Sequence, residues 1–270
     1  MTKKSPSNSW ITFPKPNPQA KLRLICLPYA GGSAMIYRTW PNNLPETVEV
    51  CAVELPGRGR QMTLPPIARL DTLVSEIAQN LLPFLDKPFA IFGHSMGALI
   101  SFELTHFLRF KYGLTPLHLF ISARRAPQIL PTKPPIYNLP EAEFLEELRL
   151  LNGTPEAVLK NAELMQLFLP VLRADFAILE TYVYTQKPPL ACPITVFGGL
   201  QDREVSYGNL EAWREQAFVP AVPEAFGPAV PEAIASFSLQ MIDGDHFFIH
   251  SAQTILLQSI ARQLQMRSLV

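Results

Sequence analysis

The sequence predicts an α/β fold in which helices flank a mostly parallel central sheet. Short apolar runs alternate with helical segments along much of the chain, and such alternation implies parallel strands joined by right-handed crossovers. Hydrophobic residues make up 48% of the sequence and charged residues 17%, as in a globular protein. A chain of 270 residues can bury the core of one α/β domain, so we expect residues 1–270 to form a single domain.

The elements up to residue 122 follow this alternation in order. Residues 1–19 are polar and broken by prolines, and we expect an extended lead-in. Apolar runs predict strands over Leu22–Leu27, Val48–Leu55, Phe89–Phe92 and Leu117–Ser122. The intervening segments predict helices over Met35–Leu44, with an interruption at Pro41, and over Leu70–Leu85 and Ala98–Phe110.

The alternation breaks between about residues 131 and 185. This stretch predicts helices over Glu141–Leu151, Pro155–Lys160 and Leu164–Tyr182, with no convincing strand. Because the α/β pattern resumes afterwards, we interpret residues 131–185 as a helical lid inserted into the chain order of the sheet. The remaining elements are strands over Ile194–Phe197 and Phe237–Ile242, and helices over Gly208–Gln216 and Ile249–Leu264.

Residues 218–233 hold two near-identical octads, FVPAVPEA and FGPAVPEA. Two copies are too few for a solenoid. Their prolines disfavour both a regular helix and a central strand. We therefore expect a proline-rich loop between a helix and the last strand.

The segment Gly93-His94-Ser95-Met96-Gly97 has the pattern G-x-S-x-G between a predicted strand and a predicted helix. In α/β hydrolases this sharp turn raises a serine hydroxyl above the edge of the sheet. The positive end of the following helix favours the anion that forms during acyl transfer. The context predicts an α/β-hydrolase fold with Ser95 as the nucleophile.

A general base is expected after the last strand, where Asp243-Gly244-Asp245-His246 forms a polar turn. The other histidines lie inside the elbow, a helix or a strand, which favours a structural role for them. The base in turn needs an acid that accepts its second N–H. Asp202 follows the strand at 194–197 and gives the chain order Ser, Asp, His of this fold. Asp245 is the alternative acid.

The oxyanion hole of such enzymes uses two backbone N–H groups, one from the residue after the nucleophile and one from the loop after the first strand. Met96 follows Ser95 directly. The loop Pro28-Tyr29-Ala30-Gly31-Gly32 follows the first predicted strand, and we expect its donor to be the N–H of Ala30.

Composition argues against several classes of function. The 23 basic and 23 acidic residues cancel, whereas nucleic-acid binding needs a basic surface. No segment is apolar enough for a signal peptide or a membrane span, so we expect a cytoplasmic protein with no membrane contact. Cys26, Cys51 and Cys192 lie within or beside apolar runs and predict buried thiols in a reducing compartment.

The chain resembles a type II thioesterase, the stand-alone editing enzyme of polyketide synthases and non-ribosomal peptide synthetases. The segments that carry the resemblance span nearly the whole chain: PKPNPQAKLRLICLPYAGGSA, VEVCAVELPGRGR, PFAIFGHSMGALISFEL, ISARRAP, LPVLRADFAILETYVY and GDHFF. The tandem octads are the main departure from the family.

The resemblance implies that Ser95, Asp202 and His246 form a catalytic triad and that the lid covers an acyl channel. The resemblance also implies the substrates, which are stalled or wrong acyl groups on the phosphopantetheine arm of acyl or peptidyl carrier proteins. We expect no metal and no bound cofactor, and a monomer. Two alternatives stay open: another α/β-hydrolase, such as an esterase or acyltransferase, and a non-catalytic binding protein on the same scaffold.

Overall fold

The computed structural model describes residues 9–151, 153–154, 156–217 and 237–267. Within these residues seven strands form one sheet in the order β1-β3-β2-β4-β5-β6-β7. Every neighbouring pair is parallel except β1 and β3. The strands are β1 (Ile11–Thr12), β2 (Leu22–Leu27), β3 (Val48–Val53), β4 (Phe89–His94), β5 (Leu119–Ser122), β6 (Ile194–Gly199) and β7 (Phe237–Ile242).

Helices follow most of the strands in chain order. The α-helices in the described residues are α1 (Leu70–Leu81), α2 (Met96–Tyr112), α3 (Glu141–Leu151), α4 (Glu156–Leu159), α5 (Ala162–Glu180), α6 (Tyr207–Glu211), α7 (Phe248–Ser251) and α8 (Gln253–Arg267). Short 3₁₀ helices are η1 (Ala34–Tyr37), η2 (Trp40–Asn42), η3 (Gly59–Gln61), η4 (Leu82–Phe84) and η5 (Ala212–Gln216).

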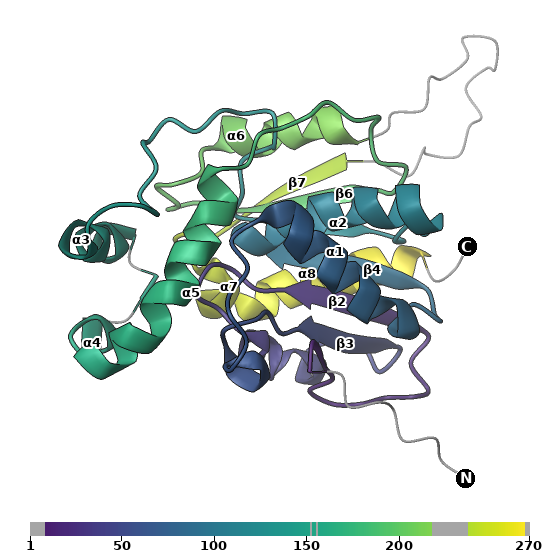
Figure 1. The fold of residues 1–270 in the computed structure, drawn as a ribbon. Helices are drawn as coiled ribbons and strands as arrows, with labels where there is room; N and C mark the ends of the chain where they lie inside the picture. Colours follow the sequence, from purple (N-terminus) through teal and green to yellow (C-terminus); the bar gives the residue numbers. More distant parts are fainter. Residues whose placement is uncertain (1–8, 152, 155, 218–236, 268–270) are drawn as a thin grey trace.

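The sheet is covered on both faces, as a parallel sheet must be. Alternate residues of β2 point to opposite sides: Ile25 packs with α1 and α2, whereas Leu24 packs with η1, η2 and α8. Figure 1 shows α1 and α2 in front of the strands and α8 behind them. Because both faces are buried, β3 and β4 are buried along their whole length. The expected α/β-hydrolase-type architecture is confirmed.

The helices α3, α4 and α5 lie between β5 and β6 in the chain and gather beside one end of the sheet (Figure 1). They have a small apolar core of their own, in which Phe144 and Leu148 of α3 pack with Leu172 of α5. This cluster is separate from the two cores that flank the sheet. The helical segment expected at residues 131–185 is therefore present, and its helices pack together beside one end of the sheet.

Several predicted elements differ in detail. The helix expected over Met35–Leu44 is two 3₁₀ turns, because Pro41 cannot continue a helix. The helix expected over Ile249–Leu264 is split at Ala252 into α7 and α8. The lead-in contains the edge strand β1, which pairs antiparallel with β3. The loop predicted at residues 218–233 lies outside the described residues.

Candidate active site

Ser95 sits in a sharp turn between β4 and α2. Its backbone has φ 53° and ψ −111°, a strained conformation for a residue with a side chain. A Cβ added to Gly93 would meet the Gly97 carbonyl oxygen at 2.1 Å, and one added to Gly97 would meet the Leu27 carbonyl oxygen at 2.1 Å. The turn is anchored from β5, since the Ser95 N–H donates to the Ser122 carbonyl at 2.8 Å. Only glycine at both flanking positions permits this packing.

The three residues predicted as a triad lie in one hydrogen-bonded chain. The Nε2 atom of His246 lies 3.1 Å from the Ser95 Oγ, and its Nδ1 lies 2.9 Å from Oδ2 of Asp202. The Asp202 side chain is 1% exposed, and that of His246 is 18% exposed. The acid is thus shielded from water while the imidazole reaches the cavity. These distances suit proton transfer from the hydroxyl to a histidine of fixed tautomer.

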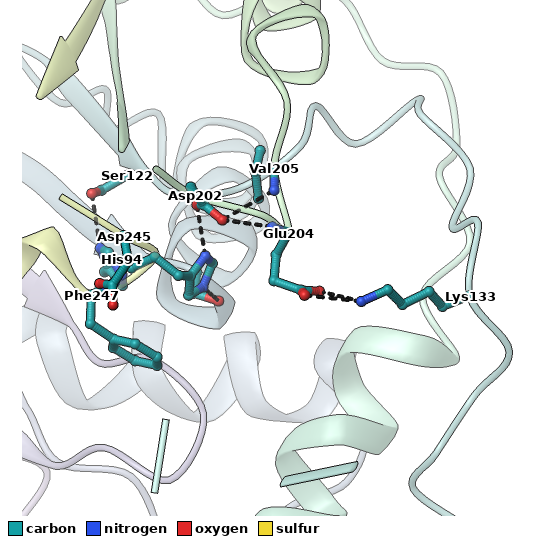
Figure 2. Close-up of polar contacts among 10 residues, drawn as sticks. His94, Ser122, Lys133, Asp202, Glu204, Val205, Asp245 and Phe247 are labelled. Atoms are coloured by element: carbon teal, nitrogen blue, oxygen red, sulfur yellow. Dashed lines mark hydrogen bonds and ion pairs between the residues drawn. The ribbon is translucent and has the colours of Figure 1, made fainter. Parts of the chain in front are cut away.

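The second carboxylate oxygen of Asp202 is also engaged. Its Oδ1 accepts hydrogen bonds from the backbone N–H groups of Glu204 at 2.8 Å and Val205 at 3.2 Å (Figure 2). The alternative acid, Asp245, instead accepts the N–H of Phe247 at 2.8 Å. Within the described residues it makes no hydrogen bond to the imidazole of His246. The geometry therefore favours Asp202 over Asp245.

His94, the elbow residue before Ser95, supports the site without reaching the serine. It is fully buried between β5 and the His246 loop. Its Nδ1 lies 2.9 Å from the Ser122 hydroxyl and its Nε2 lies 2.9 Å from the backbone oxygen of His246. Burial, with a smaller contribution from the charge of His246, holds the pKa of His94 well below its ordinary value. A neutral His94 can donate to the His246 carbonyl and so fix that loop.

The two predicted oxyanion donors flank the serine. Met96 is the first residue of α2, where helix N–H groups have no partner within the helix. Ala30 follows β2, the neighbour of β4, and lines the same cavity as Ser95. Among the described residues, the Ala30 N–H donates to no protein acceptor. Both groups are therefore available to a ligand oxygen, although the Met96 side chain itself is buried away from the cavity.

A buried ion pair, missed by the sequence analysis, holds the Ala30 loop. Asp175 of α5 accepts the Gly31 N–H at 2.7 Å and forms two 2.7 Å hydrogen bonds with the guanidinium of Arg58. Arg58 also donates to the Gly32 carbonyl at 3.1 Å. The two side chains are 5% and 1% exposed. The one local signal for this contact is an acidic residue inside the mostly apolar run VLRADFAIL.

The cavity above Ser95 has a volume of about 160 Å³ and lies between the loops of the sheet edge and the helices α3 and α5. Its apolar wall comes from α3 and α5: Leu148, Leu151, Leu172, Phe176 and Leu179. A larger cavity of about 750 Å³ lies apart from these residues, between α1, α2 and the segment 181–187. We place the reaction in the smaller cavity, because only there do a nucleophile, a base and candidate oxyanion donors converge.

In the part of the chain that the structure describes, no group of three or more His, Cys, Asp or Glu side chains could hold a metal ion. All three cysteines are buried, as expected, and burial raises the pKa of Cys51 to about 12. No described helix has the length and apolar character needed to cross a bilayer.

Comparison with known proteins gives a consistent result. The family model described as Thioesterase domain matches residues 22–264. Gramicidin S biosynthesis protein GrsT of Aneurinibacillus migulanus is 43% identical over 266 residues, which cover 98% of each chain. Linear gramicidin dehydrogenase LgrE of Brevibacillus parabrevis is 44% identical over 264 residues, covering 97% of this chain and 94% of the relative.

Among solved structures, the type II thioesterase BorB from the borrelidin biosynthetic cluster superposes with a TM-score of 0.81 and 34% identity. The alignment covers 97% of this chain and 100% of the other. The similarity therefore extends over the helices α3, α4 and α5 as well as the sheet.

Proposed function

This chain belongs to the thioesterase family, and we propose that it hydrolyses acyl thioesters with Ser95 as nucleophile, His246 as general base and Asp202 as the acid that orients the base. It is a type II thioesterase, similar along its whole length to proteins of peptide and polyketide antibiotic pathways. Its function is the removal of stalled or aberrant acyl groups from such assembly lines.

The reaction proceeds in two balanced steps. As the Ser95 Oγ attacks the thioester carbonyl, Nε2 of His246 takes the hydroxyl proton and the carbonyl oxygen becomes an oxyanion. The N–H groups of Ala30 and Met96 stabilise that charge. The carbon–sulfur bond then breaks, and the thiol leaves with the proton from His246. A water molecule, deprotonated by the same imidazole, then attacks the acyl ester. The bond between the acyl carbon and the Ser95 Oγ breaks, His246 returns the proton to Ser95, and the acid is released.

The observation that carries this proposal is the hydrogen-bonded chain from Ser95 through His246 to Asp202 at the floor of the cavity. In thioester hydrolysis the triad supplies both the nucleophile and the proton shuttle. The apolar wall from α3 and α5 supports a role of the lid in holding the acyl chain.

The natural substrate in this proposal is an acyl group on the phosphopantetheine arm of an acyl or peptidyl carrier protein. Carrier proteins of a synthase would be the partners, and neither nucleic acid nor membrane would take part. We further propose that the enzyme works as a monomer in the cytoplasm, which agrees with a balanced net charge and buried cysteines.

The name of the Brevibacillus relative describes a dehydrogenase, and we do not extend that activity to this chain. The dinucleotide fingerprint G-x-G-x-x-G occurs nowhere in the sequence. The turn after β2, where doubly wound nucleotide-binding folds place that fingerprint, here contributes Ala30 to the serine cavity.

The experiment that tests the proposed function measures free acid and free carrier thiol released from an acyl-loaded carrier protein. The wild-type enzyme should release both in equal amounts, and Ser95→Ala should release neither above the uncatalysed rate. A simple alkyl ester of the same acid, an added amine nucleophile and a nicotinamide cofactor serve as parallel assays. Faster ester cleavage, transfer to the amine or cofactor oxidation would each contradict the proposal.

A further inference from the structure

We propose that Arg124 and Arg125 make the acyl cavity selective by charge, so that it rejects acyl groups carrying an ammonium and accepts neutral or carboxylate-bearing ones. This inference rests on the proposed function and adds a substrate class to it. Both arginines line the cavity that contains Ser95 and His246.

The fold brings the two arginines to the serine. Strand β5 neighbours β4, with Ser122 in register with His94, so the residues that follow β5 emerge beside Ser95. Ala123 turns the chain with a φ of 51°. The backbone of Arg124 is then fixed by Trp213, whose indole N–H donates to the Arg124 carbonyl at 2.7 Å. The side chains of both arginines are therefore presented from an anchored segment at the end of a buried strand.

The positive charge of this pair is not neutralised by the protein. Among the described residues, the Arg124 guanidinium forms no hydrogen bond, ion pair or ring contact. Arg125 donates from Nε to the Ile129 carbonyl at 3.2 Å and meets no described carboxylate. Among the described residues that line the cavity, the one acidic side chain is Glu204, which is paired with Lys133 at 2.8 Å (Figure 2). By contrast, Arg58 nearby is fully paired with Asp175.

Two unpaired guanidinium groups in a partly apolar cavity are costly unless a ligand compensates them. Burial, reinforced by the charge of Arg125, accordingly lowers the pKa of Arg124 to about 9. A carboxylate or a hydrogen-bond-accepting oxygen on the acyl group would relieve this unfavourable charge. An ammonium group in the same cavity would add a third positive charge.

The two arginines would therefore select among the acyl groups to be removed. An aminoacyl group with a free ammonium is repelled by the pair, whereas an acyl group without an ammonium is admitted. Discrimination by charge requires no close fit to the acyl chain, which suits an enzyme that acts on acyl groups of varied shape.

The test uses N-acetylcysteamine thioesters in matched pairs. Butanoyl and β-alanyl groups have the same number of heavy atoms but differ by an ammonium, and succinamoyl and succinyl groups differ by a carboxylate. For the wild type, kcat/KM after subtraction of the uncatalysed rate should be at least about tenfold higher for butanoyl than for β-alanyl, since like charges repel strongly in a partly buried site. Succinyl should be hydrolysed at least as fast as succinamoyl.

Arg124→Gln and Arg125→Gln, separately and together, should bring the butanoyl to β-alanyl ratio towards one while the butanoyl rate changes less. Arg69→Gln, at the residue before α1, is the matched control, because Arg69 is exposed and paired with Asp71 outside this cavity. It should keep the wild-type ratio. A ratio that is unchanged in the double variant would overturn the inference.

Two further outcomes separate this inference from its alternatives. If the wild type hydrolyses none of the four thioesters or their carrier-bound forms, the proposed function fails. If butanoyl thioesters are hydrolysed without any dependence on acyl charge, only the charge selection fails. Butanoyl-pantetheine and butanoyl-4′-phosphopantetheine form the last pair. An effect of the arginine variants confined to the phosphorylated arm would contradict a role in reading the acyl group.

Discussion

Asp202 and Asp245 both lie near His246, but they meet different atoms. Asp202 faces Nδ1 of the imidazole, whereas Asp245 caps the backbone N–H of Phe247. Only the first contact can stabilise the imidazolium that forms when Ser95 loses its proton. The two carboxylates are therefore a natural comparison within one protein.

We expect Asp202→Asn to lower kcat by a factor on the order of 10⁴, because the amide favours the wrong imidazole tautomer. Asp245→Asn should stay near the wild-type rate, since it leaves the ring contacts of His246 unchanged. Both are measured as single-turnover release of acid from an acyl-loaded carrier, with circular dichroism to check the fold. The assignment is wrong if Asp245→Asn is crippled and Asp202→Asn is not.

The residues of the site differ in how well local sequence predicts them. Ser95 and His246 could be predicted because tight turns after strands carry local patterns, G-x-S-x-G and GDH. The prediction of Asp202 also required its place after the strand at 194–197 and the chain order Ser, Asp, His of this fold. Asp175 could not be predicted, since its partner Arg58 lies 117 positions away and no local pattern links them. Arg124 entered the sequence analysis only within the segment ISARRAP. Its lack of a countercharge could not be predicted, because that is a property of the folded cavity.

At the scale of elements, the ion pair between Arg58 and Asp175 connects helix α5 to the loop that carries Ala30. Removing one partner of a buried ion pair typically costs about 3–5 kcal/mol of stability, because the other charge is left unpaired. Replacing both partners by apolar residues avoids that cost. The pair can therefore be dissected into a stability contribution and a positioning contribution.

We expect Asp175→Asn to lower both the melting temperature and kcat, the latter by about 10²–10³ if the Ala30 donor is displaced. The double variant Arg58→Met/Asp175→Leu should recover the melting temperature but not kcat, because nothing then holds the Gly31 N–H. Thermal unfolding and steady-state hydrolysis of the same preparations make the comparison. Recovery of full activity in the double variant would contradict a positioning role.

The apolar wall from α3 and α5 predicts a second effect at this scale. Phe176→Ala enlarges the cavity on the lid side, so the preferred acyl chain should lengthen while hydrolysis of an acetyl thioester changes little. An exposed lid residue, Leu150, provides the control variant Leu150→Ala. The measurement is kcat/KM across a series of straight-chain thioesters. A uniform loss at every length would argue against a lid role.

Long, strongly patterned elements could be predicted from the sequence, and short or irregular ones could not. The strands β2, β3, β4 and β5 lie within two residues of their expected bounds, since largely apolar runs mark strands buried on both faces. The two residues of β1 carry no periodic pattern, and only pairing with β3 defines them as a strand. Likewise, the break between α7 and α8 at Ala252 has no proline or glycine to announce it.

At the scale of the whole molecule, the tandem octads at residues 218–233 are the segment that the sequence predicts to be a dispensable loop. Adding residues to an exposed loop costs little, since each doubling of its length adds only about 0.6 kcal/mol of closure entropy. We expect deletion of Phe226–Ala233 to leave the melting temperature and the hydrolysis of a small thioester near wild type. A higher KM for the acyl-loaded carrier alone would instead assign the octads to carrier docking. Loss of both activities would mean that the segment positions His246.

The central claim is that Ser95 forms a covalent bond to the acyl group, and a fluorophosphonate probe tests it most directly. Peptide mapping by mass spectrometry should find one adduct per chain, on the peptide containing Ser95. The adduct should form much more slowly in His246→Ala. In the wild type, the fraction of hydrolytic activity lost on acyl-loaded carrier should equal the fraction of chains labelled. An adduct on another residue, or full hydrolytic activity in a chain labelled at Ser95 or carrying Ser95→Ala, would contradict the account.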